Sequence, residues 1–522
     1  MKPHYNPAYS LDMAAHSHGQ RFAIHYGETS YTVLEATLIT KQLAAMLGDI
    51  GVGQGDRVAL IARNSPYHML LHVACARIGA VFVPISYRFA GPELADVLDF
   101  AQPRVVVADL ESSRIQKRHG VSYFVIDDDV EFSSLTNGYP KGFQGLSACY
   151  RKSHPMEATA WKTGLAVDTN VSEVDGGAML FTSGSTGRPK AVYLTHEQLW
   201  WGSQNFREGF EYSNHDVELV TVPLTHIGGF NGTTLDLFSH GGTIVIVREF
   251  DPGRVLQELE RHRVAMMFAV PTMYSALLAH PDFSQRDLTA FRLPLIGGAI
   301  CPPALLARME ESGLRPLNVW GMTETGGAGF MLSQDLLAQA RGSIGSPFAH
   351  VSAKIIDEFG QEADTGELVI SGPHVVHSYW NDPSFTAEAF RDGWLLTGDM
   401  ARRDAEGHVW IVGRTRYQIN TGGEKVIPEE VSSVLLQMPQ IVDAAVVGIP
   451  DETWGEAVAA AIVVKPGEQA PDLGTIRDFV ASHIARYKAP RAVCVVPSLP
   501  TNANGKTDMA QIKKMCLDAR KG

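Results

Sequence analysis

The feature that most restricts the fold of this chain is a glycine- and hydroxyl-rich loop between two strand-like runs. Apolar residues 178–181 precede the loop, and residues 191–194 follow it. Gly184 and Gly187 lack Cβ atoms, so backbone N–H groups can approach an anion closely, and Lys190 adds a positive charge. The hydroxyl donors of the loop are Thr182, Ser183, Ser185 and Thr186. The loop is therefore expected to bind a polyphosphate.

The spacing of this loop differs from that of a Walker loop. A Walker loop places Gly-Lys-Ser/Thr consecutively, whereas Arg188 and Pro189 separate Gly187 from Lys190 here. Ala191 follows the lysine, so no hydroxyl group is placed there for a magnesium ion. A P-loop ATPase is therefore disfavoured.

Length and charge exclude further classes of protein. With 522 residues the chain is too long for one compact core, so two or more domains are expected. A net charge of −13 argues against a nucleic-acid-binding protein, whose affinity usually comes from a basic surface.

The run GVGQGD at 51–56 follows a helical pattern and precedes a strand, the reverse of the order in a dinucleotide-binding loop. We interpret it as a turn, which disfavours a dinucleotide-dependent oxidoreductase.

Cysteine placement and the N-terminal sequence predict a cytoplasmic protein. The five cysteines are scattered, without a CxxC pair or a Cys/His cluster, as expected of reduced thiols. Residues 1–20 lack the apolar core of a signal peptide. No run of 18 apolar residues indicates a transmembrane segment.

The periodicity of the chain predicts an α/β fold class. Helix-like and strand-like segments alternate over residues 1–110, which indicates a largely parallel sheet. Beyond about residue 340, short strand patterns punctuated by glycines predict a β-rich subdomain. Residues 418–522 form a compact α/β set of their own and include a basic C-terminal tail. We therefore expect the main domain boundary at 414–417.

Several strands are expected to end where a ligand could bind. Val220, Val222 and Leu224 alternate like a strand, with His226 at its end. The runs RLPLIGGAICPP and RPLNVWGMTETGG each place a glycine after a strand pattern. In open α/β sheets, ligands bind beyond the carboxyl ends of the strands. These loops are therefore candidate parts of a binding site.

The motif WGMTETGG at 320–327 completes the basis for a family resemblance. Taken alone, its Thr323-Glu324 pair would more often be a helix cap than a metal site, but a strand pattern precedes it and glycines flank it. With the phosphate loop, it resembles the signatures of the AMP-forming adenylating enzymes, the superfamily of acyl-CoA synthetases, luciferases and peptide-synthetase adenylation domains. Trp320 stands where that motif usually has tyrosine. Further matches occur in family order over nearly the whole chain.

The resemblance implies a fold and an activity. It implies a large multi-subdomain N-terminal adenylation domain over 1–413, a hinge at 414–417 and a small mobile α+β C-terminal cap domain over 418–522. It implies an enzyme that joins a carboxylic acid to AMP with ATP and Mg²⁺, releases pyrophosphate and passes the acyl group to an acceptor. Two negative reactants meet in such a step, so positioning and charge neutralisation carry its rate.

The resemblance also implies roles for individual residues. The ATP- and AMP-binding residues would be Thr182, Ser183, Gly184, Ser185, Thr186, Gly187, Lys190, Gly297, Gly298, Ala299, Trp320, Gly321, Met322, Thr323, Asp399 and Arg414. Of these, Asp399 and Arg414 would hold the ribose. Lys506, Thr323 and His226 would be catalytic, and Glu324 would hold Mg²⁺. Without the resemblance, Lys506 would be interpreted as a solvated surface residue.

The acid is expected to be fatty, aryl or polycyclic. Its binding residues would be His226, Phe230, Asn231, Gly326 and Gly327. In amino-acid-activating relatives an aspartate lies next to the histidine position, whereas Ile227 stands there in this chain. An amino-acid substrate is therefore disfavoured, and the apolar, glycine-rich loops suit a hydrophobic acid.

Two acceptors remain open. Gly422, Gly423 and Glu424 resemble the turn along which CoA passes, so CoA is the first choice. Arg416 at the hinge, where Asp or Lys is usual, favours the alternative of an amine acceptor and an amide synthetase. No carrier-protein motif occurs, so a stand-alone enzyme is expected, with a homodimer as one option. An adenylate-binding regulatory protein without turnover is the alternative outside enzymes.

Overall fold

A computed structural model describes residues 4–89, 91–128, 139–153, 175–182, 190–422, 424–501 and 507–521, without the side chains of Arg416 and Lys521. The chain forms two compact units. Unit 1 comprises Met1–Ser352 and Ile370–Leu395, and unit 2 comprises Ala353–Val369 and Leu396–Gly522. The β-rich segment thus contributes to both units. The hinge expected at 414–417 lies within unit 2 and stays a prediction.

The first sheet of unit 1 is nearly all parallel. Its strands in the described part of the chain are β3 (Arg57–Ile61), β4 (Val81–Ile85), β5 (Val105–Ala108), β6 (Ser122–Val125), β7 (Gln144–Gly145), β8 (Gly176–Thr182) and β9 (Lys190–Thr195). They are ordered β7-β6-β5-β3-β4-β8-β9, and β8–β9 is the one antiparallel pair among them. This arrangement confirms the parallel sheet predicted for residues 1–110. The run at 51–56 is a turn between α2 (Val33–Asp49) and β3, as predicted.

A second sheet of unit 1 supplies further strand ends. Its strands, within the residues that the structure describes, are β1 (Phe22–Tyr26), β2 (Thr29–Thr32), β10 (Val217–Val220), β11 (Thr243–Ile246), β12 (Met266–Ala269), β13 (Leu293–Gly297), β14 (Leu317–Trp320), β15 (Phe330–Leu332) and β16 (Ser346–Pro347). Their order is β16-β15-β14-β13-β12-β10-β11-β1-β2. The adjacent strands β1, β11, β10, β12, β13 and β14 are parallel, so their carboxyl ends lie at one edge.

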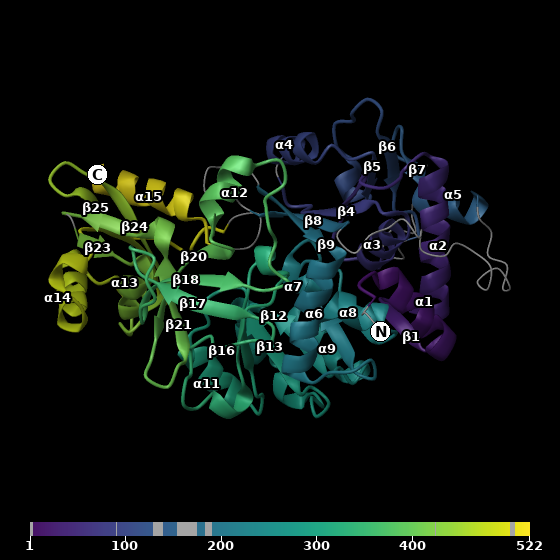
Figure 1. Ribbon diagram of the computed structural model, residues 1–522. Helices are drawn as coiled ribbons and strands as arrows, with labels where there is room; N and C mark the ends of the chain where they lie inside the picture. Colours follow the sequence, from purple (N-terminus) through teal and green to yellow (C-terminus); the bar gives the residue numbers. More distant parts are fainter. Residues whose placement is uncertain are drawn as a thin grey trace. The chain divides into compact units, whose positions relative to one another are not determined.

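Helices cover the sheets of unit 1 (Figure 1). They are α1 (Pro7–His18), α2 (Val33–Asp49), α3 (Tyr67–Ile78), α4 (Gly91–Ala101), α5 (Leu146–Ser153), α6 (His196–Phe210), α7 (Ile227–Phe230), α8 (Asp236–Ser239), α9 (Pro252–Arg261), α10 (Pro271–Ala279), α11 (Pro303–Glu311) and α12 (Pro383–Ala389). Thr32 and Glu35 form a capping box at the start of α2, and Thr195 and Gln198 form one at the start of α6. Such reciprocal hydrogen bonds satisfy the free N–H groups of a helix start.

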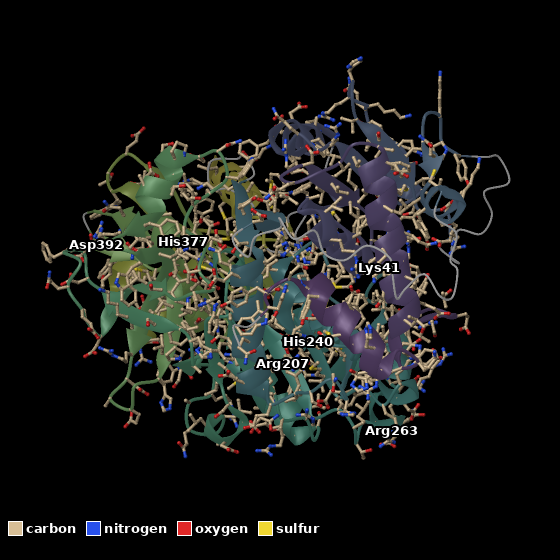
Figure 2. The ribbon with its side chains drawn as sticks, turned by 45° about the vertical axis from the view of Figure 1, so that its right-hand side comes forward. Lys41, Arg207, His240, Arg263, His377 and Asp392 are labelled. Carbon is tan, nitrogen blue, oxygen red and sulfur yellow. The ribbon has the colours of Figure 1, made fainter. Side chains whose placement is uncertain are left out.

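A buried carboxylate joins α6 to α8. Asp236 accepts hydrogen bonds from Arg207 at 2.7 Å and from the Tyr212 hydroxyl at 2.7 Å, and His240 lies 3.2 Å from it. Figure 2 shows Arg207 and His240 near each other. Burial alone would raise the pKa of Asp236, but hydrogen bonding and charge from His240 and Arg207 lower it below its usual range. The helices around the expected acid-binding loops are therefore fixed to one another.

Unit 2 contains a sheet covered on both faces. Its strands and helices are β22 (Ile419–Thr421), β23 (Glu424–Val426), β24 (Ile441–Asp451), β25 (Gly455–Val464), β26 (Ala492–Val495), α13 (Pro428–Leu435), α14 (Leu473–His483) and α15 (Met509–Lys521). Val458 and Ile462 of β25 pack with α13 and α14, whereas Ala459 packs with Ile512 of α15 on the other face. Figure 1 shows the helices on the two sides of β24 and β25.

The β-rich segment forms the remaining sheet. Its strands are β17 (Ser352–Ile356), β18 (Thr365–Ser371), β19 (Phe390–Arg391), β20 (Trp394–Arg403) and β21 (Val409–Arg414). They include the short strands predicted beyond residue 340. The hairpin of β19 with the start of β20 belongs to unit 1, and β20 then continues into unit 2.

Two details differ from the sequence analysis. The strand expected to run to Leu224 ends at Val220, because Pro223 has no N–H group with which to continue a ladder. The last part of the expected basic tail is helix α15 from Met509 onward, with Ile512 and Cys516 fully buried. Arg520 of this helix binds Asp451 at 2.6 Å, so part of its charge is paired within unit 2.

Candidate active site

Neighbouring strands of the second sheet bring two glycine loops to one edge. β13 ends at Gly297 and β14 at Trp320, and the two strands are parallel. A Cβ atom at Gly297 would collide with the backbone oxygen of Val319, so only glycine permits this close approach. Gly298 has a φ of +76°, and Gly298 and Ala299 are exposed beyond the strand. The loops expected to contact adenine therefore begin side by side.

The turn after β14 is tied together by its own backbone. The N–H groups of Gly326 and Gly327 donate to the carbonyls of Thr323 and Met322, at 3.1 Å and 3.0 Å. A Cβ atom at Gly321 would collide with the Gly327 carbonyl group. Glycine is thus required where the turn closes on itself. Thr323 in the same turn is half-buried, so its hydroxyl is accessible enough to donate to a ligand.

Glu324 is held by an aromatic residue that sequence analysis missed. Its side chain is buried, and the Tyr379 hydroxyl donates to it at 2.6 Å. The backbone N–H of Val376 donates to the Glu324 carbonyl at 2.9 Å. Burial, together with the Glu324 charge, raises the pKa of Tyr379 well above its usual range. Tyr379 therefore stays protonated and available as a donor to the carboxylate.

Lys190 lies beside the same aromatic cluster. Its ammonium group lies 2.7 Å from the centroid of the Phe385 ring. That ring contacts Tyr379 edge-on, with centroids 4.6 Å apart. Backbone pairing fixes the arrangement, because the N–H of Trp380 donates to the carbonyl of Ala191 at 2.9 Å. One pair of aromatic rings thus connects the lysine at the end of the phosphate loop to the carboxylate expected to bind metal.

Several predicted residues lie outside the described part of the chain. They are Ser183, Gly184, Ser185, Thr186, Gly187, Gly423 and Lys506. The two ends of the phosphate loop are described, since Thr182 ends β8 and pairs with Lys190 at the start of β9. The glycine- and hydroxyl-rich loop therefore connects two antiparallel strands.

The predicted acid-binding residues have different environments. His226 is half-buried at the N-terminus of α7. Phe230 is fully buried and packs against His72 and Phe82 of the core, with ring centroids 5.0 Å and 5.7 Å away. Gly327 lies next to Phe206.

Asn231 connects three segments around these residues. Its side-chain amide is fully buried and donates to the carbonyls of Leu199 and Gly326, at 3.1 Å and 2.9 Å. This amide therefore fixes α6 and the glycine turn against the π-helical segment at 231–235. At Gly232, which is buried, no atom from another segment lies within 4 Å of where a Cβ would be, so open space lies beside this glycine.

The predicted ribose-binding residues form an ion pair in unit 2. Arg414 Nε lies 2.5 Å from a carboxylate oxygen of Asp399, and the two residues face each other across β20 and β21. Glu429, which sequence analysis did not identify, lies beside them. Burial raises the pKa of Glu429, the charge of Arg414 lowers it and that of Asp399 raises it further. A compact cluster of one cation and two carboxylates results.

The expected CoA turn and hinge also belong to unit 2. Gly422 has a φ of +64° and donates its N–H to the Trp454 carbonyl at 2.9 Å. Glu424 is exposed at the start of β23. The backbone of Arg416 forms one turn of 3-10 helix.

Three general properties of the described residues complete the description of the site. Among the described residues, no three His, Cys, Asp or Glu side chains gather into a metal-binding group. The described part of the chain also has no helix long and apolar enough to cross a membrane. All five cysteines are free thiols.

Comparison with known proteins gives matches over both parts of the chain. The family model for AMP-binding enzymes matches residues 11–380, and the model for the C-terminal domain of AMP-binding enzymes matches residues 430–506. A feruloyl-CoA synthase from Amycolatopsis sp is 32% identical over 495 residues, covering 94% of this chain and 95% of that enzyme. An indoleacetate–CoA ligase from Aromatoleum aromaticum is 32% identical over 501 residues, covering 94% of each chain.

Solved structures agree in fold over almost the whole chain. O-succinylbenzoate CoA synthetase (MenE) from Bacillus subtilis, in complex with ATP and a magnesium ion, has a TM-score of 0.81 and 27% identity, covering 97% of this chain and 99% of that one. The amide bond synthetase McbA from Marinactinospora thermotolerans has a TM-score of 0.84 and 26% identity, covering 98% and 99%.

Proposed function

The chain belongs to the AMP-binding enzyme family, and from that premise we propose that it converts an aryl or similarly bulky carboxylic acid to its CoA thioester. The enzyme is an AMP-forming acid–thiol ligase. In the first half-reaction a carboxylate oxygen attacks the α-phosphorus of ATP, and pyrophosphate leaves. In the second, the thiol sulfur of CoA attacks the acyl carbon, loses its proton, and AMP leaves.

The observation that carries the proposal is the contact of Lys190 and Glu324 with one aromatic pair. Lys190 contacts the Phe385 ring, and Glu324 accepts from Tyr379, whose ring contacts Phe385. The cation that ends the phosphate loop and a carboxylate that could hold a metal ion thereby contact the same aromatic pair. Adenylation needs this combination, because the charge of a triphosphate must be offset while a carboxylate approaches it.

The residues fit a magnesium ion bound together with a nucleotide. Mg²⁺ is usually held by one or two carboxylates plus phosphate oxygens and water, and Glu324 supplies one buried carboxylate. The ion, when bound, would neutralise phosphate charge. Tyr379 and the backbone N–H of Val376 would hold Glu324 in position.

The remaining residue roles follow as part of the proposal. Asp399 would accept hydrogen bonds from the ribose hydroxyls, and Arg414 would orient that carboxylate and contact the same ribose. Thr323 would donate to the α-phosphate, and Lys506 would offset charge in the transition state. Arg416 would be the hinge between an adenylation domain and a mobile cap.

The acid proposed is aryl or similarly wide. His226 and the empty space at Gly232 lie six residues apart along one segment, and Ile227 contributes no charge to it. An uncharged segment with open space beside its glycine favours a hydrophobic acid over an amino acid. Feruloyl and indoleacetyl groups, which the names of the two relatives give, both contain aromatic rings.

Acid-dependent exchange of pyrophosphate into ATP, across a panel of hydroxycinnamic, indolic, fatty and polycyclic acids, tests this function. We expect exchange without CoA, and AMP with thioester when CoA is added. Lys506→Ala should cut adenylate formation by roughly 10²–10³-fold, the scale for losing one preorganised electrostatic group. Absence of exchange with every acid would leave a nucleotide-binding protein without turnover and contradict the proposal.

An amine acceptor is the second candidate. The amide bond synthetase resembles this chain in fold. The hinge carries Arg416 where Asp or Lys is usual, followed by Tyr417 where an acidic residue is common. Amide product from acid, ATP and an amine without CoA, with no thioester when CoA is present, would favour this alternative.

Location and assembly complete the proposal. We place the enzyme in the cytoplasm, where ATP and CoA are available and free thiols persist. A homodimer is proposed as its assembly, and light scattering would test it.

A further inference from the structure

Two buried thiols lie next to each other in unit 2. Cys494 is on β26 and Cys516 is on α15, and their sulfur atoms are 3.3 Å apart. Both side chains belong to the apolar cluster between α15 and the sheet, together with Ile512. A disulfide has a sulfur–sulfur distance of about 2.05 Å, so the two atoms would have to approach each other by only about 1.3 Å to form one.

The two thiols differ in their access to solvent. Cys494 keeps 8% of its surface exposed, whereas Cys516 is fully buried. Among the described strands of unit 2, β26 pairs with β25 alone, so Cys494 lies on an edge strand. Burial, and after it the hydrogen bond with Cys494, raises the pKa of the Cys516 thiol above its usual range. Cys494 is therefore the sulfur that an oxidant reaches first, and Cys516 is placed to react with it afterwards.

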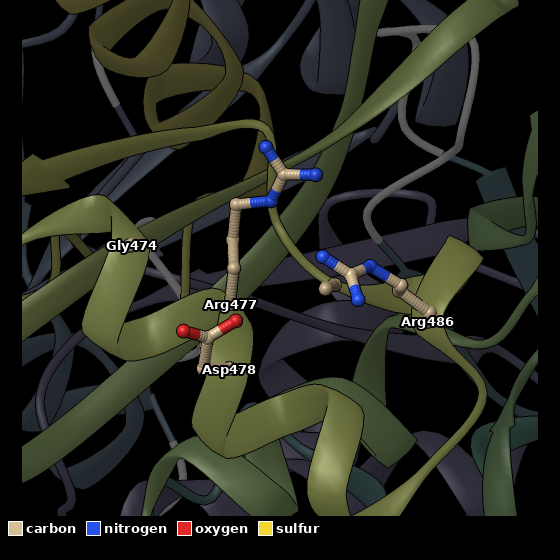
Figure 3. A pocket seen from close by; sticks show the side chains of 5 residues that line it. Gly474, Arg477, Asp478 and Arg486 are labelled. Atoms are coloured by element: carbon tan, nitrogen blue, oxygen red, sulfur yellow. The ribbon is translucent and has the colours of Figure 1, made fainter.

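The cavity of unit 2 shown in Figure 3 does not lead to this pair. It has a volume of about 170 Å³ and is lined by Gly474, Arg477, Asp478, Arg486 and Ala489. The first three of these residues belong to α14, which packs on the face of the sheet opposite to α15. We therefore expect access at the edge of β26, where the small exposed area of Cys494 favours a small oxidant such as hydrogen peroxide.

Helix α15 is joined to the base of the segment that carries Lys506. Thr501 and Thr507 form an isolated β-bridge, and the N–H of Asp508 donates to the carbonyl of Pro500 at 2.8 Å. Helix α15 begins directly after Asp508, and Lys506 directly precedes Thr507 in the sequence. A displacement of α15 toward β26 would therefore also move the base beside Lys506.

We propose that Cys494 and Cys516 form a reversible disulfide, which displaces α15 and slows adenylation. The Cys494 sulfur attacks one oxygen of hydrogen peroxide, the O–O bond breaks, and the leaving hydroxide takes the thiol proton and departs as water. The Cys516 sulfur then attacks the sulfur of the resulting sulfenic acid, the S–O bond breaks, and the hydroxide leaves with the Cys516 proton as a second water. Two thiols and one peroxide thus give one disulfide and two water molecules, and the two electrons lost by the sulfurs reduce the peroxide.

The effect on activity rests on the proposed function, in which Lys506 offsets charge in the transition state. A displacement of about 1 Å in a catalytic arrangement can lower a rate by about 10²-fold. In a compartment that thiols keep reducing, such a disulfide forms during oxidation and is reversed by thiol–disulfide exchange. Adenylation would then be slow while peroxide is present and would recover afterwards.

The first test measures the new bond without any turnover. The full-length enzyme is treated with hydrogen peroxide, digested without reductant and analysed by mass spectrometry. We expect a cross-link between the peptides that contain Cys494 and Cys516, absent from Cys494→Ala and from Cys516→Ala. The matched control is Cys149→Ser, which removes a more exposed thiol outside the pair and should keep the cross-link.

The second test measures acid-dependent pyrophosphate exchange before and after peroxide treatment. Exchange by the wild type and by Cys149→Ser should fall at least about tenfold and recover with dithiothreitol, whereas exchange by Cys494→Ala and Cys516→Ala should not fall. Absence of the cross-link, a cross-linked enzyme with unchanged exchange, or an equal loss of exchange in the two alanine variants would overturn the inference. Absence of exchange in the reduced wild type would instead contradict the proposed function, and the cross-link would still be detected by its mass.

Discussion

Arg414 and Asp399 face each other across two antiparallel strands and form an ion pair of 2.5 Å in which the carboxylate is buried. Glu429 lies beside this pair, and burial raises its pKa. A second carboxylate, half-buried next to an ion pair, is costly unless it is neutral or shared. The charges of Arg414 and Asp399 both act on the pKa of Glu429. Removal of either charge should therefore change the protonation of Glu429 as well as break the ion pair.

The first prediction concerns Asp399→Asn. The amide keeps the shape of the side chain but removes the acceptor proposed for the ribose, so the KM for ATP in pyrophosphate exchange should rise about tenfold. The pKa of Glu429 should fall, because the charge of Asp399 contributes to raising it. Carbon-detected NMR titration of Glu429 measures the second effect. An unchanged KM for ATP would remove Asp399 from nucleotide binding, and Glu429→Gln is the control that alters the cluster without altering Asp399.

The second prediction concerns Tyr379→Phe. Loss of the hydroxyl leaves the buried Glu324 carboxylate without a donor that now lies 2.6 Å away. We expect about 1–3 kcal/mol lower free energy of unfolding and a severalfold higher magnesium concentration for half-maximal pyrophosphate exchange.

Tyr274→Phe is the matched control for this variant. Tyr274 is also buried in unit 1, but its hydroxyl donates to the carbonyl of Met267 at 3.1 Å. It should lower stability without changing the magnesium dependence. If both variants change the magnesium dependence equally, Tyr379 is only a structural residue.

The sequence predicts the parts of this protein that depend on local pattern. Thr32 and Glu35, three residues apart, form a capping box of the kind that a Ser/Thr-x-x-Glu spacing produces, and the alternation in residues 1–110 gives the expected parallel strands. Gly297 ends β13 and Gly321 directly follows β14, as their patterns predict. Local periodicity and cap chemistry act within one element, so a single sequence contains enough information for them.

The missed features depend on contacts between distant residues or on sparse apolar positions. Tyr379 meets Glu324 across 55 positions of sequence, and no spacing rule connects an aromatic residue to a carboxylate at that distance. The sequence pattern did not predict helix α15, because the helix has only a few apolar positions, among them Ile512 and Cys516, between many charged ones. Phe385 carries no polar group, so the sequence pattern provided no reason to assign it to the site, although its ring contacts Lys190.

The third prediction concerns Glu218, a buried carboxyl group on β10. It accepts from the hydroxyls of Thr233 and Thr234, at 2.6 Å and 3.1 Å, and so fixes the segment that contains Gly232. Burial raises its pKa to about 7, although these hydrogen bonds oppose the shift. The pKa of Glu218 is 4.5 in the unfolded chain. Between pH 4.5 and about pH 7, the folded protein therefore keeps a proton on Glu218 that the unfolded chain has released.

Stability should therefore fall as pH rises through that window. Glu218→Gln stays neutral and keeps an acceptor for the threonines, so its stability should lack this slope, a difference of about 3 kcal/mol by pH 8. Urea unfolding of both proteins at pH 5 and pH 8 measures it. Parallel losses of stability between the two pH values would show that Glu218 is not the group responsible.

The fourth prediction concerns acid and the buried histidines. Burial lowers the pKa values of His68, His196 and His374 to about 4, from 6.5 in the unfolded chain. Between these values the unfolded chain binds protons that the folded protein does not, so stability is fully present above pH 6.5 and is lost as pH falls toward 4.

His196→Asn should reduce the dependence of stability on pH in this range, because an amide does not titrate, although it will also lower stability overall. The exposed His483→Asn should leave the dependence unchanged. Urea unfolding at pH 7, 6 and 5 gives the slopes, and a slope for His196→Asn equal to that of the wild type would mean that His196 is already protonated in the fold.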